Sequence, residues 1–390
     1  TREALCAIGN GYLVTRGACE TSSDDGTHYP GTYLAGGYNR AKTEISGRII
    51  ENEDLVNWPN WLPLSFRIDG GEWFDIDQVE LLNFQQIIDM KSGVLERRMR
   101  FRDNEDHETD LISRRFVSQS RAEYAALEWE FTPRNWSGKV EFKSAIDGSV
   151  TNNGVARYRE LNGDHFGVVD KGQIGEKGMY LLAQAHQSRL YVAQAVRTSV
   201  YQKDFPPAVS RKTNIKADYI EQIITIDAER LEPIRVEKVL SLATSKDVGK
   251  TEPLIEAKTG LYRAGNFNTL LKAHRKSWWE LWKRFDICID GNKRDQMLLR
   301  LHIFHLLQTA SLNSIKLDIG VPARGWHGEA YRGHIFWDEI YIFPFLDLRV
   351  PEITRTLMMY RYRRLNEARR NAQESGYKGA MYPWQSGSNG

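Results

Sequence analysis

The sequence predicts an α+β fold in two parts, an antiparallel β-sandwich followed by helices. Across roughly the first two-thirds of the 390 residues, short segments alternate apolar and polar side chains and are separated by turn signals. From about residue 250 onward the apolar spacing becomes helical instead. Short strands without long helices between them are typical of antiparallel sheets that pack face to face. The chain is therefore expected to begin as a sandwich and to continue as a helical domain.

Each expected strand is recognised by its alternation. In the segment YAALEWEFTP, Leu127, Trp129 and Phe131 lie on one face, and Glu128 and Glu130 lie on the other. The other segments with this pattern are 62–70, 93–103, 111–118, 138–147, 219–226 and 234–240. We expect these strands to form two sheets whose apolar faces meet.

Three helices are expected after the strands. The segment Asn268–Phe285 carries apolar residues at helical spacing, including Trp278 and Trp282. Asp295–Ser311 has the same spacing, with leucine, isoleucine and phenylalanine on its apolar side. Arg355–Glu374 is strongly charged, so this third helix is expected to face solvent in part.

Composition excludes several classes of partner. The 53 lysines and arginines are balanced by 51 aspartates and glutamates, and no basic block follows the pattern of a phosphate-binding stripe, so nucleic acid is not an expected partner. No apolar run approaches the length of a membrane span, so no membrane contact is expected. Cys6, Cys19 and Cys288 have no metal-ligand spacing, and an odd number argues against a disulfide framework. The sequence assigns no compartment, cytoplasmic or periplasmic.

The segment Pro322–Asp347 is the most unusual part of the chain, because aromatic rings, histidines, arginines and carboxylates are interspersed there with glycines. Flat aromatic faces stack on the apolar face of a sugar ring, and carboxylates accept hydrogen bonds from its hydroxyls. Trp337 and Asp338 are therefore the leading candidates for contact with a hexose. The adjacent candidates are His334, Phe336 and Glu339. A helix cap or a salt bridge is the alternative for Asp338, and a buried structural loop is the alternative for the whole segment.

Four charged or titratable residues precede this pair: Arg324, His327, Glu329 and Arg332. They can hold an anion such as phosphate, or they can form an internal ion-pair network that shapes the loop. The spacing of His327 and His334 matches no zinc motif, so no metal is expected.

A second candidate group lies in the segment Tyr382–Ser386. Trp384 can form a platform for a second sugar, and Gln385 can hydrogen-bond its hydroxyls. The alternative is a packed tryptophan that follows a turn proline.

Five stretches together resemble glycoside hydrolase family 65, which contains maltose, trehalose and kojibiose phosphorylases and related α-glucoside hydrolases. The stretches are IGNGYLVTRG, HYPGTYLAGGYN, WWELW, ARGWHGEAYRGHIFWDEIYIFPF and GAMYPWQSG, and they run from one end of the chain to the other. The resemblance implies a β-sandwich over 1–250, a helical linker over 251–292 and, over 293–390, the incomplete first part of a catalytic toroid of six helical hairpins, an (α/α) barrel. It also implies that Trp337 and Asp338 line a glucose subsite, with Trp384 and Gln385 near the acceptor subsite.

The resemblance implies inverting cleavage of the α-glucosidic bond of a short α-glucoside such as kojibiose, maltose or trehalose. The PWQS loop favours hydrolysis, and phosphorolysis to glucose 1-phosphate is the alternative. A non-catalytic carbohydrate-binding protein and a helical-toroid polysaccharide lyase are the competing classes. The general acid is expected beyond Gly390, so no catalytic residue is assigned within the chain. No cofactor is expected, inorganic phosphate would be the co-substrate of a phosphorylase, and homodimers are common in the resembling family.

Overall fold

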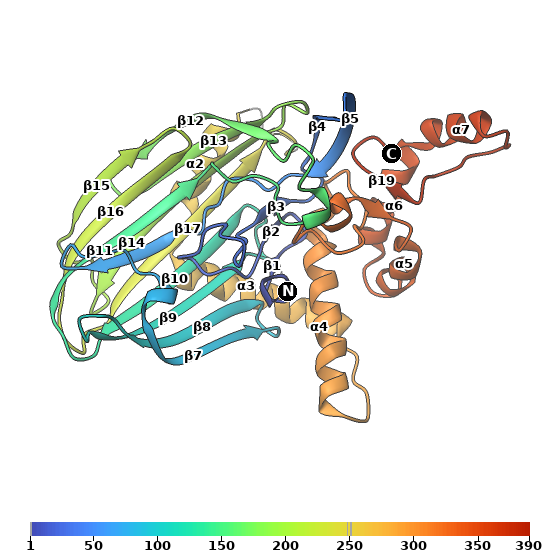
Figure 1. The fold of residues 1–390 in the computed structure, drawn as a ribbon. Coiled ribbons are helices and arrows are strands. Elements are labelled where there is room, and N and C mark those ends of the chain that lie inside the picture. Colours follow the sequence, from blue (N-terminus) through green and yellow to red (C-terminus); the bar gives the residue numbers. More distant parts are fainter. Residues whose placement is uncertain (1, 248, 250–251) are drawn as a thin grey trace.

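Two antiparallel sheets lie face to face, and the helices gather at one end and on one outer face of this sandwich (Figure 1). The structure is a computed structural model that describes residues 2–247, 249 and 252–390. The large sheet consists, in spatial order, of β12 (Phe166–Ile174), β13 (Gly178–Ala185), β14 (Tyr191–Gln202), β17 (Ile234–Thr244), β10 (Tyr124–Pro133), β9 (Glu108–Val117), β8 (Val94–Arg102) and β7 (Glu80–Asp89). The small sheet consists of β15 (Ser210–Ile215), β16 (Tyr219–Ala228), β11 (Gly138–Asp147) and β6 (Leu64–Ile68). Every segment predicted as a strand overlaps one of these strands, so the predicted sandwich is confirmed.

The core of the sandwich is built from the apolar faces that alternation predicts. Leu127, Trp129 and Phe131 of β10 are completely buried between the two sheets. The opposite face of the large sheet is buried as well, because α2 (Pro253–Arg263) and α3 (Phe267–Phe285) pack against it. The central strands of the large sheet are therefore covered on both faces, whereas the edge strand β7 is largely exposed.

The N-terminal segment forms smaller elements that lie between the sandwich and the helices. Strands β1 (Ile8–Gly9), β2 (Leu13–Thr15) and β3 (Thr32–Leu34) make a three-stranded sheet after the short helix α1 (Arg2–Leu5), and β4 (Tyr38–Ile45) and β5 (Arg48–Leu55) make a hairpin. A second hydrophobic core joins Val14, Tyr33 and Leu55 of this segment to residues of the helices such as Phe304. This shared core fixes the helical part against the sandwich.

The helical part differs from the prediction in one element. Helix α3 matches the first predicted helix, and α4 (Lys293–Thr309) matches the second within two residues at each end. The single helix predicted over 355–374 is wrong, because α6 (Pro351–Arg363) and α7 (Leu365–Glu374) are separated at Arg364, whose φ of −105° and ψ of 15° are not helical. The Arg364 side chain is buried and bonded to Asp318, so a tertiary contact interrupts a segment of good helical propensity.

The remaining elements complete the description. Helix α5 (Glu339–Asp347) was not anticipated from the sequence, and it contains Pro344. Single-turn 3₁₀ helices lie at Ile76–Gln78, Ala156–Tyr158 and Leu312–Ser314, and Ala330–Gly333 forms a turn whose backbone is not helical. The predicted domain boundary at 250/251 lies outside the described residues and stays a prediction. No helix in the described part of the chain is long and apolar enough to span a bilayer.

A buried ion cluster connects the N-terminal segment to the large sheet. The Glu20 carboxylate accepts hydrogen bonds from Arg97 Nη1 and Arg115 Nη1, each at 2.9 Å, and all three residues are buried. Burial by itself would raise the pKa of Glu20, but Arg97 and Arg115 outweigh it and hold this pKa below its usual value. The cluster therefore stabilises the fold above the unfolded pKa of the glutamate, and the contribution is lost as the pH falls through the folded pKa.

Replacing Glu20 by glutamine leaves the guanidinium groups of Arg97 and Arg115 without their carboxylate in a desolvated site. The free energy of unfolding should fall by about 3–5 kcal/mol, the usual cost of breaking a buried ion pair. Chemical denaturation followed by circular dichroism measures the change. The matched control is Glu123→Gln, which breaks an exposed pair with Arg121 and should cost at most about 1 kcal/mol. Equal losses in the two variants would contradict the assigned role of the cluster.

Candidate functional site

Two short strands bring the two candidate sugar-binding motifs together. Strand β18 (Ile335–Phe336) pairs antiparallel with β19 (Gln385–Ser386), so that Phe336 lies opposite Gln385. The pairing continues one residue further, where the Trp337 backbone N–H donates to the Trp384 carbonyl at 3.1 Å. Motifs that are distant in the sequence therefore form one surface.

The two indole rings of this surface are exposed, and one of them packs against a buried ring. Trp337 is 49% exposed and Trp384 is 64% exposed, whereas Phe336 between them is 4% exposed. The Phe336 ring meets the Trp384 ring edge-on with centroids 5.3 Å apart, and the Trp337 ring meets Tyr341 at 5.7 Å. Two indoles are thus held by packing and still present area to a ligand.

Asp338 stands at the N-terminus of α5 with its carboxylate uncommitted. It occupies the cap position of the helix, but its side chain makes no capping hydrogen bond. Among the described residues no lysine, arginine or histidine forms an ion pair with it. The side chain is partly exposed beside Trp337. Its acceptor positions are therefore available for hydroxyl groups, and the helix N-terminus favours its negative charge.

His334 and Gln385 form a hydrogen-bonded pair beneath the tryptophans. The His334 Nε2 atom lies 2.8 Å from the Glu53 carbonyl, which can only accept, so Nε2 carries the proton. The Gln385 amide nitrogen lies 2.9 Å from Nδ1 and donates to it. Burial lowers the pKa of His334, which favours this neutral form of the ring. Among the described residues, the amide oxygen of Gln385 accepts no hydrogen bond.

Glu339, the neighbour of Asp338, is committed to internal contacts. It is 3% exposed, and Oε1 accepts from the Val321 N–H at 2.8 Å while Oε2 accepts from Arg361 Nε at 3.0 Å. Burial raises the pKa of Glu339, and the ion pair with Arg361 partly opposes that shift. Arg361 also donates to Ser386 Oγ at 2.9 Å, so the pair links α5, α6 and β19.

The turn before His334 has a strained backbone. Tyr331 and Arg332 have φ of 54° and 58°, and Gly333 follows with φ of 65°. Each of the two non-glycine residues costs about 1–2 kcal/mol in this left-handed region. At Gly333 a Cβ atom would lie 2.4 Å from Leu55 Cβ, so β5 leaves room only for glycine there. Strain of this kind is typical of functional sites whose surroundings enforce the conformation.

The four charged or titratable residues of this loop have separate partners. Arg332 lies over the Tyr158 ring, with Nε 4.0 Å from Asp54 Oδ1, and Arg324 lies over Tyr331. His327 meets the ring of His305, and burial lowers its pKa to about 4. Within the described residues these side chains share no common partner, so the geometry favours contacts that shape the loop over a joint anion site.

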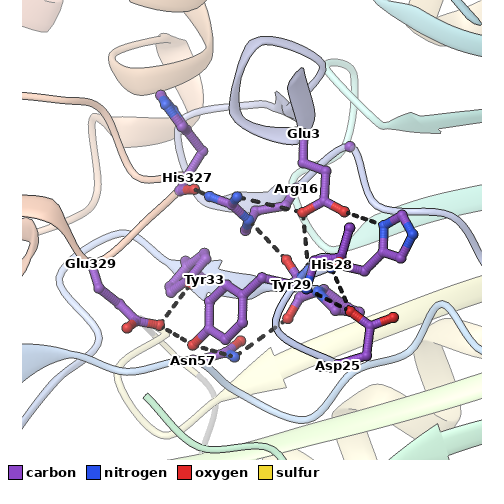
Figure 2. Close-up of polar contacts among 12 residues, drawn as sticks. Glu3, Arg16, Asp25, His28, Tyr29, Tyr33, Asn57, His327 and Glu329 are labelled. Carbon is purple, nitrogen blue, oxygen red and sulfur yellow. Dashed lines mark hydrogen bonds and ion pairs between the residues drawn. The ribbon is translucent and has the colours of Figure 1, made fainter. Parts of the chain in front are cut away.

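Glu329 is surrounded by tyrosines of the N-terminal segment. Figure 2 shows its carboxylate facing Tyr29 and Tyr33, with Asn57 beside them and Arg16 reaching the His327 carbonyl at 3.1 Å. Both tyrosines lie in the stretch HYPGTYLAGGYN, which contributes to the family resemblance, but the sequence does not identify them as site residues. No local pattern could have linked them to Glu329, because the contact spans about three hundred residues.

A metal centre is not formed by the part of the chain that the structure describes: no group of three or more histidine, cysteine, aspartate or glutamate side chains there could hold an ion. The three cysteines are free thiols.

Two family models match the sequence. The model for the N-terminal domain of glycosyl hydrolase family 65 covers residues 1–281, and the model for the central catalytic domain of that family covers residues 300–390. The chain belongs to glycosyl hydrolase family 65. The resemblance drawn from the motifs is confirmed.

Relatives and solved structures agree with this assignment. The chain is 44% identical over 393 residues to an uncharacterized glycosyl hydrolase of Mycobacterium tuberculosis strain H37Rv, and it covers 29% of that protein. It is 34% identical over 400 residues to the kojibiose phosphorylase of Caldanaerobacter subterraneus, matching all of this chain and 49% of the relative. It is also 34% identical to the trehalose 6-phosphate phosphorylase of Lactococcus lactis, covering 99% of this chain and 48% of that enzyme.

A putative kojibiose phosphorylase from the human microbiome shares the fold, with a TM-score of 0.86 at 22% identity over the whole of this chain and 50% of the other. The chain therefore spans about half the length of the phosphorylases it matches.

The candidate site lies where the two domains of the family 65 chain meet. Trp337, Asp338, Trp384 and Gln385 fall within the region that matches the central catalytic domain. The residues that hold them from below, including Glu53, fall within the region that matches the N-terminal domain. The β4–β5 hairpin of the N-terminal domain, to which Glu53 belongs, thus contributes directly to the base of the site.

Replacing Arg361 by alanine should destabilise the helical part, because it leaves the buried Glu339 carboxylate without its cation and releases Ser386. A loss of about 3 kcal/mol in unfolding free energy is expected for a broken, largely buried pair. Denaturation of the purified protein measures it.

The matched control lies on the same helix. Arg363→Ala breaks the exposed pair with Asp318 and should cost at most about 1 kcal/mol. A loss for Arg361→Ala no larger than that of the control would show that Glu339 does not depend on the ion pair.

Proposed function

We propose that the protein to which these residues belong cleaves the α-glucosidic bond of a short α-glucoside with inversion, with inorganic phosphate as the attacking group. The observation that carries the proposal is the β18–β19 pairing, which joins Trp337 and Asp338 to Trp384 and Gln385 in one surface. The similarity to proteins named kojibiose, trehalose and maltose phosphorylases supports phosphate over water. This reverses the preference for hydrolysis that the PWQS loop suggested.

The residues of the chain would hold the sugars. Trp337 stacks on the apolar face of a terminal glucose, and Asp338 accepts hydrogen bonds from its hydroxyls. Trp384 provides a platform for the second sugar, with the free amide oxygen of Gln385 as an acceptor. His334 keeps that amide in place. Rigid placement of both sugars lowers the entropic part of the barrier.

Phe336, Glu339 and Arg332 would act from below this surface. Phe336 supports the Trp384 ring, and Glu339 anchors the start of α5, on which Asp338 stands. Arg332 holds the turn through Asp54 and Tyr158. Their roles in binding would thus be indirect, through the residues they hold.

Bond cleavage in this scheme needs one protonated carboxyl that gives its proton to the leaving oxygen, while the nucleophile attacks the anomeric carbon from the opposite face. Phosphate carries its own negative charge and needs no second carboxylate to activate it. The uncommitted carboxylate of Asp338 is assigned to hydroxyl binding, and no residue of this chain is assigned as the general acid.

The reaction is tested by incubating the complete protein with a panel of kojibiose, maltose, trehalose and trehalose 6-phosphate, with and without inorganic phosphate. Phosphate-dependent formation of glucose 1-phosphate is the expected result. Release of free glucose at the same rate without phosphate would show hydrolysis instead. Binding of a sugar without any turnover would indicate a carbohydrate-binding protein.

Asp338→Ala should remove most of this activity. Two hydrogen bonds to a charged acceptor contribute about 1.5–3 kcal/mol each, so kcat/KM should fall by about 100-fold or more. Steady-state assays on the preferred disaccharide measure the loss. The control is Asp227→Ala on β16, whose side chain is 84% exposed on the sandwich, and it should keep wild-type activity. Full turnover in Asp338→Ala would refute the assignment of the glucose-binding carboxylate.

A further inference from the structure

Glu329 is a buried carboxylate that no described cation pairs with. The residue is 6% exposed, and its Oε1 atom accepts from the Tyr29 hydroxyl and from the Tyr33 hydroxyl at 2.9 Å. Its Oε2 atom accepts from the Gly154 N–H at 2.9 Å. Charged groups are rarely buried without a partner of opposite charge, so neutral donors provide the whole of its stabilisation. Burial raises the pKa of Glu329, and the three donors oppose that shift.

The donors belong to the part of the chain that matches the N-terminal domain of the family. Tyr33 lies on β3 and is completely buried. The Tyr29 oxygen accepts from the Asn153 N–H at 2.9 Å, and its hydroxyl lies within hydrogen-bond distance of Glu329 Oε1 and, at 3.0 Å, of the Thr151 carbonyl. Gly154 belongs to the loop after β11. Two segments of the N-terminal domain, residues 29–33 and 153–154, therefore converge on one side chain of the catalytic domain.

Glu329 is the residue from which the strained turn starts. Its carbonyl accepts the Arg332 N–H at 2.8 Å, which closes the turn. The far end is held by the Tyr38 hydroxyl, which donates to the Gly333 carbonyl at 2.6 Å. Trp337 and Asp338 follow this turn within a few residues. A backbone held in an unfavourable conformation requires anchors on both sides, and Glu329 is the anchor on the near side.

We propose that Glu329 is a positioning residue: with Tyr29 and Tyr33 it holds the left-handed turn, and through the turn it sets the place of Trp337 and Asp338. The proposal rests on the proposed function, since it concerns the same sugar site. A carboxylate is required because three donors converge on two oxygens. The amide nitrogen of a glutamine at this position would face one of the three donors instead of accepting from it, so that buried donor would be left without an acceptor.

The first experiment measures hydrogen–deuterium exchange in the complete protein for peptides that cover residues 331–338. Glu329→Gln should raise exchange there by about tenfold or more, the effect of losing a hydrogen bond to a charged group. Tyr33→Phe removes one donor only and should give a smaller increase, so it serves if the glutamine variant folds poorly. The matched control is Tyr124→Phe, which removes another buried tyrosine hydroxyl that donates to a backbone carbonyl, that of Gly260 at 2.9 Å, and should leave exchange in residues 331–338 unchanged.

The second experiment separates positioning from general stability. In Glu329→Gln the KM for the disaccharide should rise by about tenfold with a smaller fall in kcat, because sugar contacts are weakened in both ground and transition states. Glu329→Asp keeps the charge and should recover part of the affinity. Unchanged exchange in residues 331–338 would overturn the proposal, and so would raised exchange with unchanged KM and kcat. A wild-type protein inactive on every disaccharide would overturn the proposed function, while the exchange rates would still decide whether Glu329 holds the turn.

Discussion

The structure of the site depends on one constraint: a buried loop must find partners for its backbone polar groups. The stretch from Val321 to Phe336 has little regular structure of its own, so its partners come from other elements. The N-terminal domain provides two of them, because the Arg16 guanidinium group donates to the His327 carbonyl and the Tyr38 hydroxyl donates to the Gly333 carbonyl. The Glu53 carbonyl accepts from the side chain of His334. The loop therefore has a defined conformation only while the two domains are in contact.

The same constraint explains how the protein holds the two exposed tryptophan side chains in defined positions. Trp337 and Trp384 lie on the surface, where side chains are ordinarily mobile, but each is attached to a buried base. The buried Phe336 ring packs against Trp384, and the His334–Gln385 hydrogen bond joins the two segments that carry the tryptophans. A sugar site gains from this arrangement, because the order of the binding groups is established before the ligand arrives.

The same packing gives the neighbouring carboxylates Asp338 and Glu339 different environments. Asp338 and Glu339 are adjacent in sequence, yet α5 begins between them and directs their side chains differently. Glu339 turns inward to Arg361 and the Val321 N–H, while Asp338 remains partly exposed. Such a difference could not be predicted from residue types, because both carboxylates are equally suited to a sugar or to an arginine.

Much of the fold was predictable because its signals are local. The alternation of Leu127, Trp129 and Phe131 reflects the two-residue period of a strand, and the spacing in α3 reflects the helical period. The helix predicted through Arg364 failed for the opposite reason. Its interruption depends on Asp318, a residue distant in sequence, which binds the Arg364 guanidinium.

Residue patterns are enough to predict the sandwich, the first helices, the family, and the two motifs that carry the candidate sugar-binding residues. The pairing of these motifs, the internal position of Glu339 and the contacts of Tyr29 and Tyr33 with Glu329 appear only in the folded protein. The physical reason is the range of the interactions. Side-chain periodicity and motif spacing are properties of neighbouring residues, whereas strand pairing and the satisfaction of a buried charge depend on groups that meet only after the chain has folded.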